Sequence, residues 1–489
     1  MTQPVRPPQC PLERSPIAEL LAIAAPSVLA MISFPLKQFV DALMVSALGD
    51  VAIAGQGNGA IVGLVFMAGV MGMLSVINTF ASQCLGASRE RDAPAYAWNG
   101  VWISLIAAAL VAGVAPFIGH VFIAMEHTGE LLRTETQYAR VLLLGAFFPM
   151  AARGVAYFFY GVHKPAIVVA AMIVGFTINI GLNYLLIQGR LGFPQLGVVG
   201  AGVATVTASA CEFSVPFLFF LSPRMNAWLR TRSAWRPSMG RMRELWRVGW
   251  PAGLMFANEL LCWGIFMAWI IPKLGEAHNT ASWIALRYMQ LSFMPTVGMQ
   301  IAVTAVVGRR IGQRDPDGAQ HRAVLGVKMG MVYMGVFALA MVLFRQPMIM
   351  LFVTDAVDAQ RQAEILRIGS TIMILAAVFQ VFDALGIILI GALRGAGDTL
   401  FPGLAMAGLA WLVLIGGSAV MVALAPGLGS AGPWMMASLY IILVGLVMSR
   451  RFSHGAWRSI RVLTPHPAEP DALEADESAM ATPAAPTTP

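Results

Sequence analysis

Four acidic side chains lie well inside long apolar stretches of this sequence, where they could bind cations. They are Asp41, Glu212, Glu259 and Asp383. An ionised carboxylate at the centre of a bilayer costs roughly 3 kcal/mol, so such residues usually face a bundle interior or a wet cavity on an ion or substrate path. These acids therefore indicate transport of a charged species.

The surroundings of Asp41 have two interpretations. Lys37 precedes it by one helical turn, so the two side chains could form an ion pair that only permits insertion of the helix. Asn179 and Asn183 are also one turn apart and share a helical face, from which their amides could surround a carboxylate. Ordinary hydrogen bonding between helices is the alternative for this pair. We expect Asp41, Asn179 and Asn183 to form a substrate or proton site.

Glu259 and Asp383 are the candidates for binding a coupling ion. Glu259 has no basic neighbour on its helix and lies two turns after Pro251, where a kink frees backbone carbonyls. Asp383 follows Gln380 by three residues and precedes a glycine-containing stretch by one turn. Carboxylate oxygens suit Na⁺, and a buried carboxyl group can instead carry a proton. We expect these two acids to bind Na⁺ or H⁺.

Other polar residues in the apolar stretches could modify such a site. Glu212 borders the end of its stretch and could be a structural acid, while Arg153 can extend its charge to the membrane interface. Arg287, beside Tyr288, could balance a buried acid. The candidates for modifying the cavity are Lys37, Gln380, Arg287 and Tyr288.

Twelve apolar stretches are long enough to carry these residues across a membrane. A helix needs roughly 20 residues to cross about 30 Å of hydrocarbon. The stretches cover residues 18–47, 53–82, 95–118, 138–160, 165–188, 198–221, 245–272, 281–307, 323–344, 366–392, 402–424 and 431–448. The sequence therefore predicts an all-α polytopic membrane protein with twelve transmembrane helices.

The composition excludes a soluble enzyme of this size. Of 489 residues, 58% are hydrophobic and only 12% are charged, and four cysteines are too few for a disulfide-built secreted chain. The net charge is +7, and the basic residues flank apolar stretches, so we expect them to face anionic lipid and not nucleic acid. The sequence lacks GxxxxGK[ST], HExxH and CxxC motifs, so we expect no cofactor and no ATP-driven pump.

The chain divides into two similar halves. IAELLAIAAPSVLAMISF (17–34) matches the pattern of MRELWRVGWPAGLMFANE (242–259), which aligns Pro26 with Pro251. Because six crossings are an even number, the halves keep the same sense across the bilayer, which predicts two parallel six-helix repeats. Most lysines and arginines fall on the cytoplasmic side if both termini are cytoplasmic. The expected parts are a cytoplasmic N-terminal segment (1–16), an N-lobe (17–221), a basic cytoplasmic linker (222–244), a C-lobe (245–450) and a disordered cytoplasmic tail (451–489).

Five segments, in this order, carry a more specific signal. They are KQFVDALMVSALGD (37–50), QCLGASRERDA (83–93), NIGLNYLLIQG (179–189), GWPAGLMFANELL (249–261) and FQVFDALGIILIGALRGAGDT (379–399). On a doubled twelve-helix chain, they resemble the multidrug and toxic compound extrusion (MATE) family, NorM-type bacterial branch, over residues 15–455. The resemblance implies an antiporter, not an enzyme, that exports small organic cations such as drugs and dyes against entering Na⁺ or H⁺. It also implies a monomer in the bacterial inner membrane.

The resemblance extends to individual residues. Matched motif by motif, Asp41 falls at the family's first-helix acid, and Asn179 and Asn183 fall at its fifth-helix polar pair. Glu259 and Asp383 fall at its seventh-helix and tenth-helix acids. By resemblance, these five residues would hold the coupling ion and the substrate.

Two other functions stay open at this point. Lys37, and Arg287 in a helix where the family more often has a neutral polar residue, add positive charge near the expected cavity. Together with Arg153 they suit a lipid-linked saccharide flippase of the same superfamily, which would favour anionic head groups. A polytopic membrane transferase would need a catalytic acid, histidine or metal set near an interface, but the seven histidines are scattered.

Overall fold

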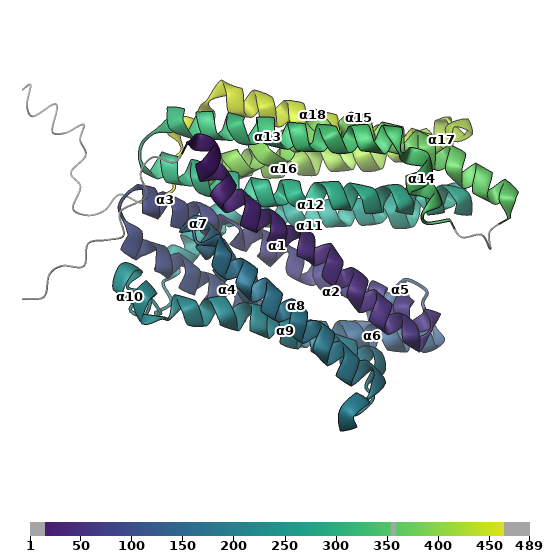
Figure 1. Cartoon of the computed structure of the whole chain (residues 1–489), viewed down its shortest axis with the longest axis horizontal. Coiled ribbons are helices and arrows are strands. Elements are labelled where there is room, and N and C mark those ends of the chain that lie inside the picture. The colour runs from purple at the N-terminus through teal and green to yellow at the C-terminus, as the bar shows by residue number, and fades with distance from the viewer. Residues whose placement is uncertain (1–14, 354–357, 464–489) are drawn as a thin grey trace, which may run out of the picture.

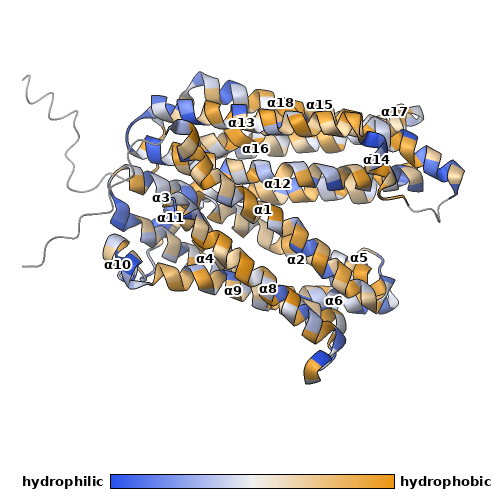
Figure 2. Ribbon diagram, viewed as in Figure 1, coloured by the Kyte–Doolittle hydropathy of each residue, from blue (hydrophilic) through white to orange (hydrophobic). Residues whose placement is uncertain are grey.

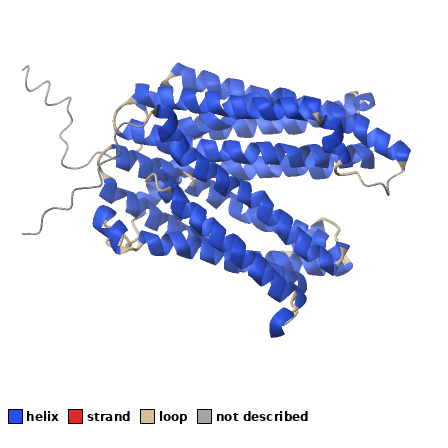
Figure 3. Ribbon diagram, in the orientation of Figure 1, coloured by secondary structure: helices blue, strands red, loops and turns tan. Residues whose placement is uncertain are grey.

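The computed structural model describes residues 15–353 and 358–463, and within these ranges the chain is helical and contains no strand (Figure 3). The helices are α1 (Pro16–Val45), α2 (Asp50–Leu74), α3 (Val76–Gly86), α4 (Ala93–Val114), α5 (Gly119–Ala124), α6 (Gly129–Leu144), α7 (Phe147–Gly161), α8 (Pro165–Gln188), α9 (Gly197–Phe220), α10 (Pro223–Leu229), α11 (Met239–Ile265), α12 (Glu276–Gly312), α13 (Pro316–Leu343), α14 (Arg345–Met350), α15 (Ala359–Ala396), α16 (Leu400–Leu409), α17 (Ser418–Leu424) and α18 (Ala431–His454). Short 3₁₀ and π segments continue several of them, including a π segment that joins α16 to α17.

The length and composition of these helices confirm the predicted membrane spans. Eleven helical stretches are long and apolar enough to cross a membrane, and α6 with α7 makes a twelfth that is bent by 49°. The sequence predicts one helix over 138–160, but the chain breaks at Gly145, where a Cβ atom would lie 2.4 Å from Cγ1 of Val206 on α9. The close approach of α9 therefore accounts for glycine at the bend. Apolar residues run along both groups of helices (Figure 2). Many of the large apolar side chains are exposed, as expected of a multi-pass membrane protein.

Two groups of helices form the molecule (Figure 1). In the structure the N-lobe consists of α2 to α10 and the C-lobe of α12 to α18, and each has its own large apolar core. The two first helices of the repeats pass between the lobes. Leu20 and Ile23 of α1 pack in the C-lobe core, whereas Val45 at its other end packs with Tyr138 in the N-lobe.

The helix α11 crosses between the lobes in the opposite direction, from the N-lobe core to the C-lobe core. Leu245 and Val248 near its start pack in the N-lobe core, and Cys262 near its end packs in the C-lobe core. Each crossing helix contains an internal proline, Pro26 in α1 and Pro251 in α11. Proline lacks an N–H donor and allows a helix to bend, so the mirrored arrangement supports the internal repeat found in the sequence.

Polar contacts join the lobes at one end, which we call the closed end and which contains the ends of α3, α12 and α15. Three side chains of α3 donate hydrogen bonds to backbone carbonyls of the other lobe. Asn78 donates to Ile301 at 3.0 Å. Thr79 donates to Arg394 at 2.8 Å, and Gln83 donates to Gly395 at 2.9 Å. Small residues allow these backbones to approach. Toward the opposite end, the two groups of helices diverge (Figure 1).

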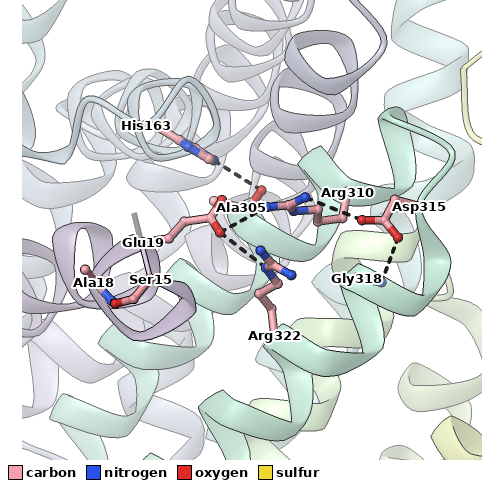
Figure 4. Close-up of polar contacts among 9 residues, drawn as sticks. All are labelled: Ser15, Ala18, Glu19, His163, Ala305, Arg310, Asp315, Gly318 and Arg322. Atoms are coloured by element: carbon pink, nitrogen blue, oxygen red, sulfur yellow. Dashed lines mark hydrogen bonds and ion pairs between the residues drawn. The ribbon is translucent and has the colours of Figure 1, made fainter. Parts of the chain in front are cut away.

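Charged residues reinforce the closed end (Figure 4). Oε2 of Glu19, in the first turn of α1, lies 3.3 Å from Nη2 of Arg310 and 3.2 Å from Nε of Arg322. Between α7 and α8, Nε2 of His163 lies 3.4 Å from the carbonyl oxygen of Ala305 in the other lobe. Burial, together with the nearby charge of Arg309, lowers the pKa of His163 to about 4, so its ring is neutral at pH 7.

The chain after α18 differs from the sequence-based expectation. The prediction of a disordered tail from residue 451 onward is wrong for residues 451–463. There α18 continues to His454, and the ring of Trp457 stacks on that of Phe452 with 5.0 Å between the ring centroids. Val462 is buried in the N-lobe core. The remainder of the expected tail, residues 464–489, and residues 1–14 of the expected N-terminal segment lie outside the described residues.

Candidate functional site

Asp41 and the two asparagines lie together where the second half of α1 packs against α8 of the N-lobe. Asp41 is 6% exposed on α1, and Nδ2 of Asn183 on α8 donates to its Oδ1 at 2.5 Å. The same amide lies 3.4 Å from Oδ1 of Asn179, one turn earlier on the same face. Nδ2 of Asn179 and Oδ1 of Asn183 are buried without a hydrogen-bond partner. Because unsatisfied buried polar atoms are costly, this cluster can accept a further polar group or proton.

Lys37 does not form the ion pair considered for it with Asp41. Its Nζ lies 3.2 Å from Oε1 of Glu212 on α9, and both side chains are partly buried. Gly175 of α8 makes room for this contact, since a Cβ atom there would lie 2.3 Å from Cγ of Glu212. Glu212 is therefore a structural acid, and the only side chain that hydrogen-bonds Asp41 among the described residues is a neutral amide.

Glu259 lies in the C-lobe half of α11 and accepts hydrogen bonds from two neutral donors. Nε1 of Trp263 donates to its Oε1 at 2.8 Å, and the hydroxyl of Tyr440 on α18 donates to its Oε2 at 2.9 Å. Trp263 follows Glu259 by four residues, a spacing that is visible in the sequence, but it was not among the predicted site residues. Tyr440 carried no such signal, because it lies 181 residues away along the chain.

Asp383 of α15 is near enough to Glu259 for the charge of one acid to act on the other. Tyr440 is within electrostatic range of both. Among the described residues, no ion pair involves either acid, and Asp383 makes no side-chain hydrogen bond. The structure therefore combines two acids from different helices without a basic partner, an arrangement that a bound cation would stabilise.

Three of the expected modifying residues lie apart from this acid pair. Gln380 is buried and donates to Oγ of Ser292 at 3.0 Å instead of contacting Asp383. Tyr288 donates to the carbonyl oxygen of Met348 at 2.9 Å, and Arg287 is exposed. The structure does not bring these side chains into contact with Glu259 or Asp383 by any hydrogen bond or ion pair in the part that it describes.

One buried acid was missed in the sequence. Glu135 of α6 is fully buried and lies 2.9 Å from Nδ1 of His127, while Nδ2 of Asn58 donates to it at 3.1 Å. The predicted apolar stretch begins at residue 138, whereas α6 begins at Gly129. Within the described ranges, no group of three or more His, Cys, Asp or Glu side chains could hold a metal ion. Glu259 and Asp383 could hold a monovalent cation only together with other oxygen atoms.

Comparisons with known proteins identify the family. The MatE family model matches residues 26–185 and 251–420. The chain is 28% identical over 439 residues to the multidrug resistance protein NorM of Burkholderia vietnamiensis, covering 88% of this chain and 92% of that protein. It is 28% identical over 451 residues to a probable NorM of Pseudomonas putida, covering 91% and 95% of the two chains.

Solved structures share the fold. A MOP superfamily transporter from Pyrococcus furiosus superposes with a TM-score of 0.80 at 22% identity, covering 91% of this chain and 97% of the other. A eukaryotic MATE transporter superposes with a TM-score of 0.79 at 17% identity, covering 91% and 96%. The chain therefore belongs to the MatE family and is of the NorM type of multidrug and toxic compound extrusion (MATE) proteins, which are membrane transporters and not enzymes.

Proposed function

We propose that this protein is a cation-coupled multidrug antiporter that exports small organic cations from a bacterial cell. The observation that carries the proposal is the pair of Glu259 and Asp383, two acids within electrostatic range and without a basic partner. The names of the NorM relatives support drug export as the task of the transporter.

The coupling rests on competition for negative charge. A cation that binds at Glu259 and Asp383 relieves their mutual repulsion, whether it is a proton or a Na⁺ ion that also uses the hydroxyl oxygen of Tyr440. In the N-lobe, Asp41 with Asn179 and Asn183 offers one acid and two unused amide atoms to a substrate or proton. The bound coupling ion weakens the hold of the carboxylates on a cationic substrate, so the two exchange.

Alternating access requires the closed end to separate. The contacts of α3 with the carbonyls of Ile301, Arg394 and Gly395 would break when the lobes rock the other way. One elementary charge that moves with the membrane potential contributes about 2.3 kcal/mol per 100 mV. Coupled ion entry can therefore supply the free energy that breaks and re-forms these contacts in each transport cycle.

The orientation follows from the basic residues. We infer that both termini and the closed end are cytoplasmic, because most lysines and arginines then fall on the inside. The described arrangement, with lobes that diverge at the opposite end, is then the one open to the outside of the inner membrane. A monomer suffices, since the charged sites lie within one chain.

The flippase alternative loses support from the contacts of Lys37. Its positive charge is paired with Glu212, so it does not add a free cationic group beside Asp41. Arg287 makes no hydrogen bond or ion pair among the described residues, and it does not neutralise either acid of the C-lobe. The acids without basic partners therefore favour cationic over anionic substrates.

Proteoliposomes with an imposed Na⁺ or pH gradient test this function. We expect ion-driven ethidium export in the wild type, driven by one of the two gradients, and at least a tenfold loss in both Asp383→Asn and Glu259→Gln. Glu364→Gln is the matched control, because Glu364 is an exposed acid on the same helix as Asp383. Normal export in both acid variants, with insertion verified, would remove the C-lobe ion site from the mechanism.

A further inference from the structure

A second site lies at the closed end, away from the acid pair. A cavity of about 720 Å³ opens where α11, the turn from α15 to α16 and the segment after α18 meet. Asp383 is separated from this turn by about 20 Å along α15, at 1.5 Å per helical residue. The cavity is therefore distinct from the proposed ion site.

The walls of this cavity are mostly apolar and firmly packed. Thr399 donates a hydrogen bond to the carbonyl of Val248 at 2.6 Å, which fixes the start of α16 against α11. One turn later, a Cβ atom at Gly403 would lie 2.8 Å from the carbonyl oxygen of Pro251. Leu400 and Leu404 line the cavity from α16, and each is 51% exposed. They form an open apolar strip that suits a hydrocarbon chain.

Two arginines give the mouth of the cavity a net positive charge. Nε of Arg451 lies 2.7 Å from Oδ2 of the buried Asp398, and its guanidinium stacks over the ring of Phe401 at 4.8 Å. This pair is neutral and leaves the two terminal nitrogens of Arg451 without a partner in the described chain. Arg247 also lines the cavity, is exposed, and forms no hydrogen bond or ion pair with any described residue. Arginine binds phosphate oxygens well through its fixed fork of donors.

The neighbours of Arg247 place the cavity mouth at the membrane surface. Trp246 is 62% exposed and Trp250 is 38% exposed on the same helix. Exposed tryptophans gather at the depth of lipid head groups, where one part of the ring is apolar and the N–H is wet. Basic pockets between membrane helices at this depth bind anionic lipid head groups.

We propose that this cavity binds one anionic phospholipid of the leaflet at the closed end. The phosphodiester contacts Arg247 and the free edge of Arg451, and one acyl chain lies along Leu400 and Leu404. Because the first half of α11 packs on the N-lobe core and α16 belongs to the C-lobe, the lipid bridges the lobes. It thereby stabilises the arrangement in which the closed end is joined.

Native mass spectrometry of the full chain tests the proposal, with phosphatidylglycerol and phosphatidylcholine of equal chain length as probes. We expect the wild type to retain one phosphatidylglycerol at least fivefold more tightly than phosphatidylcholine. Arg247→Gln should remove this preference. Arg243→Gln is the matched control, since Arg243 is exposed one turn earlier on α11 and does not line the cavity.

Three outcomes of the retention measurements would overturn the proposal. They are an unchanged preference in Arg247→Gln, an equal loss in Arg243→Gln, and equal retention of both lipids by the wild type. Millimolar glycerol phosphate separates a lipid from a free phosphate ester: it should not displace the lipid, because it lacks the acyl chain, and full displacement would refute the lipid assignment. Melting temperatures in phosphatidylcholine nanodiscs verify that both variants are folded.

Discussion

Gly86 of α3 is the position at which one methyl group should open the closed end. A Cβ atom there would lie 1.9 Å from the backbone carbonyl oxygen of Arg309 in the other lobe, far inside van der Waals contact. Gly86→Ala must therefore push α3 away from α12. The same movement lengthens the three hydrogen bonds that Asn78, Thr79 and Gln83 donate across the lobes.

The expected size of the effect follows from those bonds. Each is worth about 1 kcal/mol net, so their loss destabilises the closed end by about 3 kcal/mol. At 1.4 kcal/mol per factor of ten, the population with a separated closed end rises on the order of a hundredfold.

Thiol labelling from the side of the closed end measures this population. Ser82 of α3 is fully buried at the lobe contact, so Ser82→Cys reports separation in a background without the four native cysteines. An impermeant maleimide should label the Gly86→Ala background on the order of a hundredfold faster. Gly113→Ala in α4 is the control, because a Cβ atom at Gly113 meets nothing within 4 Å.

Equal labelling rates in the wild-type, Gly86→Ala and Gly113→Ala backgrounds would refute the reasoning. Such a result would mean that the helices absorb the methyl group without separating. Faster labelling in both glycine variants would attribute the effect to a general loss of stability. Only a rise specific to Gly86→Ala supports the contact between α3 and α12 as the element that holds the lobes together.

Two further predictions concern charged groups in and beside the N-lobe. Glu212→Gln leaves Lys37 unpaired near Asp41, so cation export in the ethidium assay should fall about tenfold, which corresponds to roughly 1.4 kcal/mol. The double variant with Lys37→Gln should recover export, and failure of this rescue would contradict the pairing. The closed end holds the pKa of His163 near 4, below its ordinary 6.5, so the neutral ring is favoured there and separated lobes bind the extra proton. As the pH falls from 6.5 towards 4, the joined arrangement of the closed end loses up to about 3 kcal/mol of stability relative to the separated one. Spin-label distances across it should widen from pH 7 to pH 5 in the wild type but not in His163→Gln, and equal widening would exclude His163 as the cause.

Local chemistry explains why much of the fold was predictable. A helix that crosses hydrocarbon needs an apolar run of fixed length, and such a run is visible in any single segment. The pairing of Asn179 with Asn183 was predictable for a similar reason, because residues four apart share a helical face. The bend at Gly145 was not, since it depends on Val206 of a different helix.

The partners of the acids show the limit of such reasoning. Lys37 lies four residues from Asp41 but pairs with Glu212, 175 residues away, because α1 presents this side chain to α9. Tyr440 reaches Glu259 only because α18 and the end of α11 both contribute to the C-lobe core. The crossing of α1 and α11 between the lobes was likewise outside the reach of the sequence, which placed each helix wholly in its own half.

The sequence alone determined that this chain crosses a membrane many times, that it is built from two related halves, and that four acids lie inside its apolar stretches. These properties depend on the length and spacing of residues along single helices. Only the tertiary structure decided which charges are neutralised and which stay free, and at which end the lobes are joined. The physical reason is that hydrogen bonds and ion pairs act over a few ångströms in space, and only the packing of helix faces brings distant residues that close.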